Sequence, residues 1–126
     1  MKPRAVDFVV YAVSDMDRSE AFYRDVLGLD IEVRRGEPGT RAADFMEFDA
    51  GGTSIAVGVL PGGQPNPNAL VALAVEHVGD AVEELRGKGV PVTMDTIETP
   101  GCYMAIVEDP DGNRILLHQR KDGSWG

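Results

Sequence analysis

The stretch DPDGNRILLH, residues 109–118, decides the fold because it places a tight turn directly before a strand. Pro110 and Gly112 supply the turn, since proline presets φ and glycine adopts a positive φ without strain. An apolar run follows at residues 115–117, as in a strand that is buried on at least one face. The stretch therefore predicts a hairpin whose second strand covers residues 114–120.

A matching pattern occurs earlier in the chain. The segment FDAGGTSI at residues 48–55 is similar to EDPDGNRI at residues 108–115. Four landmark pairs are separated by 62, 61, 60 and 60 residues, and these are Phe8 with Leu70, Gly28 with Gly89, Asp49 with Asp109, and Ala56 with Leu116. Near-constant separations of this kind indicate that the chain contains an internal duplication.

Each half begins with an apolar strand, starting at Val6 in the first half and at Ala69 in the second. A helix follows each strand, near residues 15–27 and 79–88, with apolar residues at helical spacing. Three further strands then complete each half as βαβββ. We expect them near residues 29–35, 43–49 and 53–60, and near residues 91–97, 102–108 and 114–120.

The helix ends carry clear signals. Ser14 or Asp15 is expected to cap the first helix, because a short acceptor side chain satisfies free N–H groups at a helix start. Gly28 and Gly89 follow the two helices, where glycine commonly terminates a helix with positive φ. These signals limit both helices to the stretches between strands.

One helix covers only one face of a four-stranded sheet, so the other face must curl or pack on a partner. We therefore predict an α+β fold of two βαβββ modules that form an open half-barrel cleft, the default ligand site. The first module covers about residues 5–60 and the second about 69–120. The Gly-, Pro- and Asn-rich residues 60–69 form a linker. The whole chain, residues 1–126, is interpreted as one domain.

The composition argues against several classes of binding partner and location. The net charge of −9 opposes binding to nucleic acid or anionic membranes, which requires basic clusters. No apolar run approaches a membrane span, and the N-terminus lacks the apolar core of a signal peptide. The single cysteine, Cys102, excludes an internal disulfide and favours a cytoplasmic location. The expected partners are a small organic ligand and a second copy of the chain.

Three stretches together carry a resemblance to a known family. They are VVYAVSDMDRSEAFYRDVLGLDI at residues 9–31, VEELRGKGVPV at residues 82–92 and DPDGNRILLHQ at residues 109–119. Over nearly its whole length the chain resembles the vicinal oxygen chelate superfamily, which holds glyoxalase I, extradiol dioxygenases, fosfomycin resistance enzymes and bleomycin resistance proteins. The resemblance implies the fold but not one activity, because its members do unrelated jobs on one scaffold.

The resemblance also implies where a metal would bind. Metal-dependent members place His, Gln or Glu at three or four positions, on the first and last strands of each module. In this chain those positions are Phe8, Ala56, Leu70 and Leu116. All four are apolar, whereas divalent metals need N, O or S donors. We therefore expect no metal and no other cofactor.

Alternation along the strands predicts which side chains line the cleft. Leu116 shares its face with His118 and Arg120, and Phe8 shares its face with Val10. By the resemblance, Cys102, Met104 and Ile106 point inward, with Asp44, Met46 and Phe48 as their first-half counterparts. The polar groups are then His118, Arg120, Cys102 and either Asp44 or Glu47. The predicted ligand-binding residues are Phe8, Val10, Met46, Ala56, Leu70, Cys102, Met104, Leu116, His118 and Arg120.

Three functions fit these residues. The first is a metal-free protein that binds or sequesters a small molecule, as bleomycin resistance proteins do; the acidic surface suits a cationic ligand. The second is a lyase, isomerase or dioxygenase-like enzyme that uses His118 as acid or base, or a nonstandard metal set of His118, Cys102 and a carboxylate. The third is an accessory homodimer with a vestigial cleft. The more ordinary interpretation of His118 is a strand-end residue that is hydrogen-bonded or solvated, and that of Cys102 is a small buried hydrophobe.

Overall fold

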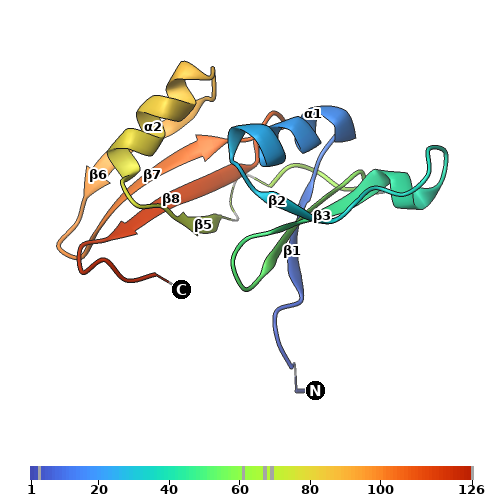
Figure 1. Cartoon of the computed structure of the whole chain (residues 1–126), viewed down its shortest axis with the longest axis horizontal. Helices are drawn as coiled ribbons and strands as arrows, with labels where there is room; N and C mark the ends of the chain where they lie inside the picture. Colours follow the sequence, from blue (N-terminus) through green and yellow to red (C-terminus); the bar gives the residue numbers. More distant parts are fainter. Residues whose placement is uncertain (3, 61, 67, 69, 126) are drawn as a thin grey trace. The chain divides into compact units, whose positions relative to one another are not determined.

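The computed structural model describes residues 1–2, 4–60, 62–66, 68 and 70–125, and it divides into two compact units, the first ending at Asn66 (Figure 1). Pro61, Pro67 and Ala69 of the predicted linker lie outside the described residues. The described linker residues at 62–66 and 68 form no helix or strand.

The first unit contains one four-stranded sheet and three short helical segments. Its strand order is β1-β4-β3-β2, with β1 parallel to β4 and the other pairs antiparallel. The elements are β1 (Phe8–Ala12), α1 (Met16–Ala21), the π-helical turn η1 (Phe22–Val26), β2 (Asp30–Val33), the 3₁₀ turn η2 (Arg41–Asp44), β3 (Phe45–Asp49) and β4 (Ser54–Gly58).

The second unit repeats this topology. Its strand order is β5-β8-β7-β6, again with one parallel pair, β5 with β8, and two antiparallel pairs. The elements are β5 (Val71–Ala74), α2 (Val78–Gly87), β6 (Val92–Glu98), β7 (Cys102–Glu108) and β8 (Arg114–Arg120). The shared order confirms the predicted pair of βαβββ modules.

The predicted first helix is divided into two parts. Asp15 is its N-cap, and the Asp15 carboxylate accepts a hydrogen bond from the Arg18 backbone N–H at 3.1 Å. After Ala21 the backbone widens into a π-helical turn, in which the Leu27 N–H donates to the Phe22 carbonyl at 2.9 Å. Gly28 then ends the segment with φ of 76°, as predicted.

Tyr23 lies at the centre of the first core and has no exposed surface. Its ring stacks on Phe48 of β3, with centroids 5.6 Å apart, and on Tyr11 of β1 at 6.4 Å. Phe22 packs edge-on against it at 5.2 Å. These contacts fix the helical segment to one face of the sheet, since aromatic pairs combine large buried area with a defined geometry.

The second core forms where α2 packs against β6, β7 and β8 (Figure 1). Val82 and Leu85 of α2 are buried, as are Ile115 and Leu117 of β8. A side chain of β8 provides a hydrogen-bond acceptor for the start of α2: the Val78 N–H donates to the Gln119 side-chain carbonyl at 2.9 Å. This contact supplies a hydrogen bond that the sequence around the helix start does not provide.

The β7–β8 turn is built around a buried carboxylate. Asp109 Oδ1 accepts hydrogen bonds from the backbone N–H groups of Asp111 at 2.9 Å and Asn113 at 2.8 Å. Its Oδ2 accepts from the Asn113 side-chain amide at 2.8 Å. Gly112 completes the turn with φ of 84°. The equivalent Asp49 is exposed, and its carboxylate accepts a hydrogen bond from the Gly51 N–H at 2.8 Å.

Replacing Asp109 with alanine should therefore destabilise the protein by about 2–4 kcal/mol, because buried donors lose a charged acceptor. Asp49→Ala is the matched control, and it should lower the free energy of unfolding by about 1 kcal/mol or less. Urea denaturation of both variants measures the difference. Equal losses would show that the buried turn has no special role.

Candidate functional site

The strand β8 presents two chemically different faces. Ile115 and Leu117 are buried on the side of α2, while Leu116 and His118 point to the opposite face and remain half-buried. Within the described residues of the second unit, α2 covers the first of these faces and no helix covers the second. We call this side, opposite α2, the open face of the second sheet.

The strand register shows which residues share this open face. Met104 lies opposite His118, Cys102 opposite Arg120, and Ile106 opposite Leu116. On the other side of β8, Ala72 and Ala74 lie beside Leu116 and His118. The structure thus brings together five of the predicted residues: Cys102, Met104, Leu116, His118 and Arg120.

His118 is the polar group at the centre of this open face. Its backbone carbonyl accepts a hydrogen bond from the Val75 N–H at 3.0 Å. Within the described part of the chain, its imidazole makes no hydrogen bond or ion pair. The ring nitrogens are therefore available to a molecule that binds on the face.

Cys102 lies at the edge of the same face as a half-buried free thiol. Its sulfur is 3.0 Å from the Thr99 hydroxyl, and its backbone N–H donates to that hydroxyl at 3.0 Å. Nearby, Lys121 and Glu98 form an ion pair at 2.6 Å. The Lys121 hydrogen bond lowers the pKa of Glu98, and the same contact raises the pKa of Lys121.

The first sheet has an open face of the same kind, on the side away from Tyr23. The register places Val10, Ala56, Glu47 and Val33 in one row across the four strands. Phe8 and Phe45 lie on this face to either side of the row. Along this row the face is apolar and aromatic around the Glu47 carboxylate, and Asp49, two residues after Glu47 on β3, lies on the same face at the end of the strand.

Met46 does not lie on this open face, so that part of the sequence prediction is wrong. Met46 pairs with Val57, and Phe48 pairs with Ile55, on the side of Tyr23, and both are fully buried. The reason is the length of the hairpin connection. Residues 50–53 join β3 to β4, whereas residues 109–113 join β7 to β8, which is one residue longer. A one-residue difference moves every side chain of the strand to the other face.

Glu47, and not Asp44, therefore faces the open side. Asp44 ends the turn η2, is exposed, and accepts a hydrogen bond from the Val59 N–H through its backbone carbonyl at 3.0 Å. Glu47 is half-buried beside Ala56. Correct alternation makes Glu47 the counterpart of Ile106, and Phe45 the counterpart of Met104.

Two aromatic rings meet over the middle of this face. Phe8 and Phe45 pack edge-to-face with centroids 5.7 Å apart. Phe8 pairs with Ser54 and Phe45 with Gly58, so Ala56 lies midway on the diagonal between them. Ala56 has no exposed surface. The small side chain at this position leaves room for the two rings to meet.

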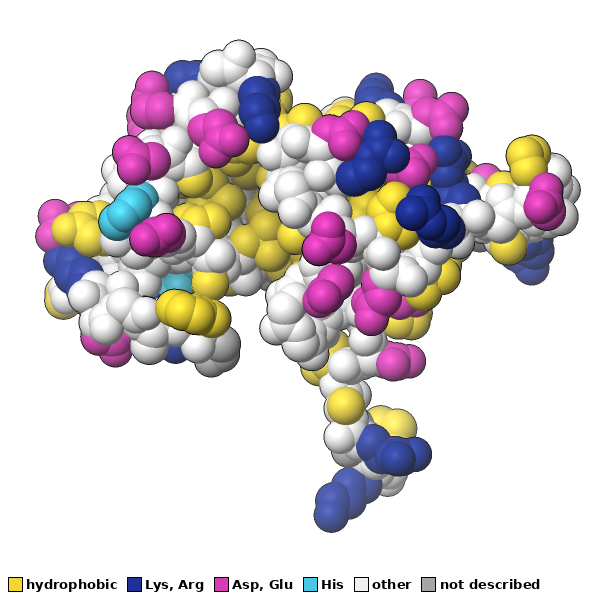
Figure 2. Space-filling view, in the orientation of Figure 1, with side chains coloured by type: hydrophobic (Ala, Val, Ile, Leu, Met, Phe, Trp, Pro, Cys, Tyr) yellow, Lys and Arg dark blue, Asp and Glu magenta, His cyan; other side chains and the backbone are white. Residues whose placement is uncertain are grey.

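Part of the predicted apolar surface is open to solvent. Phe8, Val10 and Leu70 are 39%, 38% and 44% exposed, high values for large apolar side chains. Figure 2 shows hydrophobic side chains at the surface over β7 and β8, while charged side chains of both signs gather over α1 and α2. Grouped exposed apolar residues commonly mark binding surfaces.

Among the described residues, no helix is long and apolar enough to cross a bilayer.

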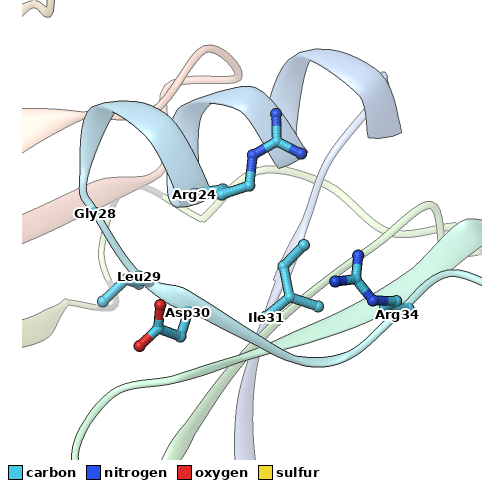
Figure 3. Close-up of a pocket in the computed structure, with 6 residues that line it drawn as sticks. All are labelled: Arg24, Gly28, Leu29, Asp30, Ile31 and Arg34. Carbon is cyan, nitrogen blue, oxygen red and sulfur yellow. The ribbon is translucent and has the colours of Figure 1, made fainter.

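A separate hollow of about 320 Å³ lies where the helical segment of the first unit meets β2 (Figure 3). It is lined by Arg24, Gly28, Leu29, Asp30, Ile31 and Arg34. Arg24 is already engaged with Asp25 at 2.7 Å and with Glu20 at 3.3 Å. The sequence interpretation missed this hollow, which has no recognisable motif.

Comparison with known proteins identifies the family. The model of the Glyoxalase/Bleomycin resistance protein/Dioxygenase superfamily matches residues 5–117. The chain belongs to this superfamily. It is 32% identical over 123 residues to a lactoylglutathione lyase from Salmonella typhimurium, covering 90% of this chain and 91% of the relative.

Two solved structures have a similar fold. TnmS3, an antibiotic binding protein from Streptomyces sp. CB03234, aligns with a TM-score of 0.76 at 26% identity, covering 96% of this chain and 99% of that one. A superfamily member from Sphaerobacter thermophilus DSM 20745 aligns with a TM-score of 0.75 at 24% identity, covering 93% and 98%. At 24% identity, the similarity to the Sphaerobacter protein shows a shared fold and nothing about function.

The four positions that the resemblance assigns to metal donors do not fit a metal in this superfamily member. Phe8, Ala56, Leu70 and Leu116 carry only hydrocarbon side chains. Within the described ranges, no three His, Cys, Asp or Glu side chains come together as a metal site would require. Ala56 is in addition buried next to two aromatic rings.

The alternation of β8 can be tested by two neighbouring substitutions. Leu117→Ala should destabilise the protein by about 2–5 kcal/mol, because it removes a buried side chain from the core under α2. His118→Ala should change stability by about 0.5 kcal/mol or less, because its ring has no partner within the described residues. Chemical denaturation measures both. A large loss for His118→Ala would indicate a structural role for the imidazole.

Proposed function

We propose that this protein binds a small organic molecule without a metal ion. The observation that carries the proposal is the consistent replacement of all four donor positions by Phe8, Ala56, Leu70 and Leu116. A metal-dependent enzyme of the superfamily needs donors there, whereas a binding protein gains apolar contact area from the same replacements. Each open face is a candidate site by itself, and the second is the stronger candidate because it carries His118.

The second open face supplies the chemistry that such a ligand needs. Leu116, Met104 and Ile106 offer an apolar wall, and His118 offers within it an imidazole that has no partner among the described residues. Ligand sites are typically apolar with a few polar groups that fix orientation. This combination supports a ligand with an apolar body and a polar group that reaches His118, with Arg120 and Cys102 near the edge.

A structural relative supports a role in which the ligand is bound and not chemically altered. TnmS3 is described as an antibiotic binding protein, and it shares the fold at 26% identity. Drug sequestration is therefore part of the proposal for this chain. A homodimer is also proposed, on the basis of the internal repeat and the linker.

An enzyme is the second candidate, because several relatives near 30% identity are named lactoylglutathione lyase. Their names favour a lyase reaction, and an isomerase or dioxygenase-like reaction is the wider alternative within the superfamily. Such a reaction would depend here on His118 as acid or base, or on an unusual metal set that includes His118 and Cys102. Metal content separates the binding protein from the metal-dependent form of this enzyme.

The purified protein should hold no stoichiometric Zn, Fe, Mn or Ni, even after incubation with each ion and desalting. The physical reason is the lack of donor atoms at the four positions. Elemental analysis of the parent and of His118→Ala measures this. A bound ion near one per chain that is lost in His118→Ala would overturn the proposal in favour of the enzyme.

Thermal-shift screening of a compound library should find ligands, since binding to the native state raises the melting temperature. For a ligand found in this way, His118→Ala should weaken binding by roughly three- to thirtyfold, as expected from loss of a hydrogen bond that is neutral or charge-assisted. Isothermal titration calorimetry gives the two dissociation constants. Gln119→Ala, on the opposite face of β8, is the control that should leave the affinity unchanged. A library without ligands would contradict the proposed function.

A further inference from the structure

We propose that the open face of the first sheet binds the cationic group of a small organic molecule, with Glu47 as its counter-ion. The inference rests on the proposed function, because it assigns a ligand class to one of the proposed faces. It goes further by naming a charged residue and a chemical group. The class is an organic amine or other organic cation with an apolar or aromatic flank.

The position of Glu47 is unusual for a carboxylate. It is half-buried, with Ala56 on one neighbouring strand and Val33 on the other. In the part of the chain that the structure describes, its carboxylate makes no hydrogen bond and no ion pair. Partial burial of a charged group without a partner costs free energy, and a bound cation would remove that cost.

The fold itself does not require an acid at this position. Ile106 occupies the corresponding place in the second sheet, where it lies beside Leu116 as Glu47 lies beside Ala56. The same topology is therefore built with an apolar side chain in one half. This makes a ligand role the better account of the carboxylate.

The rest of the sheet strengthens its negative field. Its four strands contain Asp30, Glu32, Glu47 and Asp49 but neither Lys nor Arg. Asp30 and Asp49 lie opposite one another, an arrangement that is destabilising for like charges. Glu32 accepts a hydrogen bond from Ser54, and Asp49 accepts one from the Gly51 N–H. Asp30 is exposed at the strand end opposite Asp49, so Glu47 is the half-buried carboxylate that lies in the middle of this face without a partner among the described residues.

Aromatic rings on the same face suit the same kind of ligand. Phe45 lies two residues before Glu47 on β3 and therefore on its face, and its ring meets Phe8 edge-to-face. A cation near the face of an aromatic ring gains favourable electrostatic energy. Val10 and Val33 supply apolar contact on either side. A carboxylate beside two rings matches an amine with a hydrocarbon flank.

Three matched probes test this inference: 4-phenylbutylamine, 4-phenylbutanol and 4-phenylbutanoate. They share a phenylalkyl body and have a cationic, a neutral and an anionic head group respectively. Titrations followed by ¹H–¹⁵N NMR should show the amine binding about fivefold or more tightly than the alcohol, with shifts in β3 and β4. In Glu47→Gln the amine and the alcohol should bind within about twofold of each other.

Glu37→Gln is the matched control, because it removes the same charge from an exposed side chain outside the sheets. It should keep the preference for the amine. Equal binding of amine and alcohol to the parent, no binding of the amine, or an unchanged preference in Glu47→Gln would each overturn the inference. The proposed function would still stand if the library screen found neutral or anionic ligands that depend on His118, so the two failures are distinguishable.

Discussion

The architecture depends on one constraint: a single helical segment can cover only one face of a four-stranded sheet. In the first unit, Tyr23 stacks between Tyr11 and Phe48 and joins the helical segment to that face. In the second unit, α2 packs over Ile115 and Leu117. In each unit the hydrophobic core forms between the helical segment and one face of the sheet. The opposite faces are left with half-buried or exposed apolar side chains, and a protein keeps such surface mainly where it binds something.

Because the helix faces carry the packing, the open faces are free to differ between the repeats. The same register position is Glu47 in one sheet and Ile106 in the other, and Phe45 corresponds to Met104. The second sheet has His118 at its centre, whereas the strands of the first carry acids and neither Lys nor Arg. Duplication thus produced two similar scaffolds with different chemistry. The difference lies in the side chains that the fold does not constrain.

Sequence patterns predicted most of the fold, because its signals are local. The strands β7 and β8 match their predicted ranges, and Gly28 and Gly89 end the helical segments with positive φ. The failures have longer-range causes. The shorter β3–β4 connection reversed the expected face of Met46, and no pattern near Val78 indicates that Gln119 provides its hydrogen-bond partner. Such features depend on contacts between strands, or between a strand and a helix, that are distant in sequence.

The apolar residues at the metal-donor positions do more than remove metal-coordinating side chains, because they also pack against their neighbours. The rings of Phe8 and Phe45 meet over Ala56, which is buried beneath them. A carboxylate restored at position 56 alone would be buried between aromatic rings without a partner, which is strongly unfavourable. Metal binding therefore cannot return through one substitution, because the aromatic pair must be displaced at the same time. The apolar contacts that exclude the metal also form part of the surface available to an organic ligand, and this links the absence of donors to the proposed binding role.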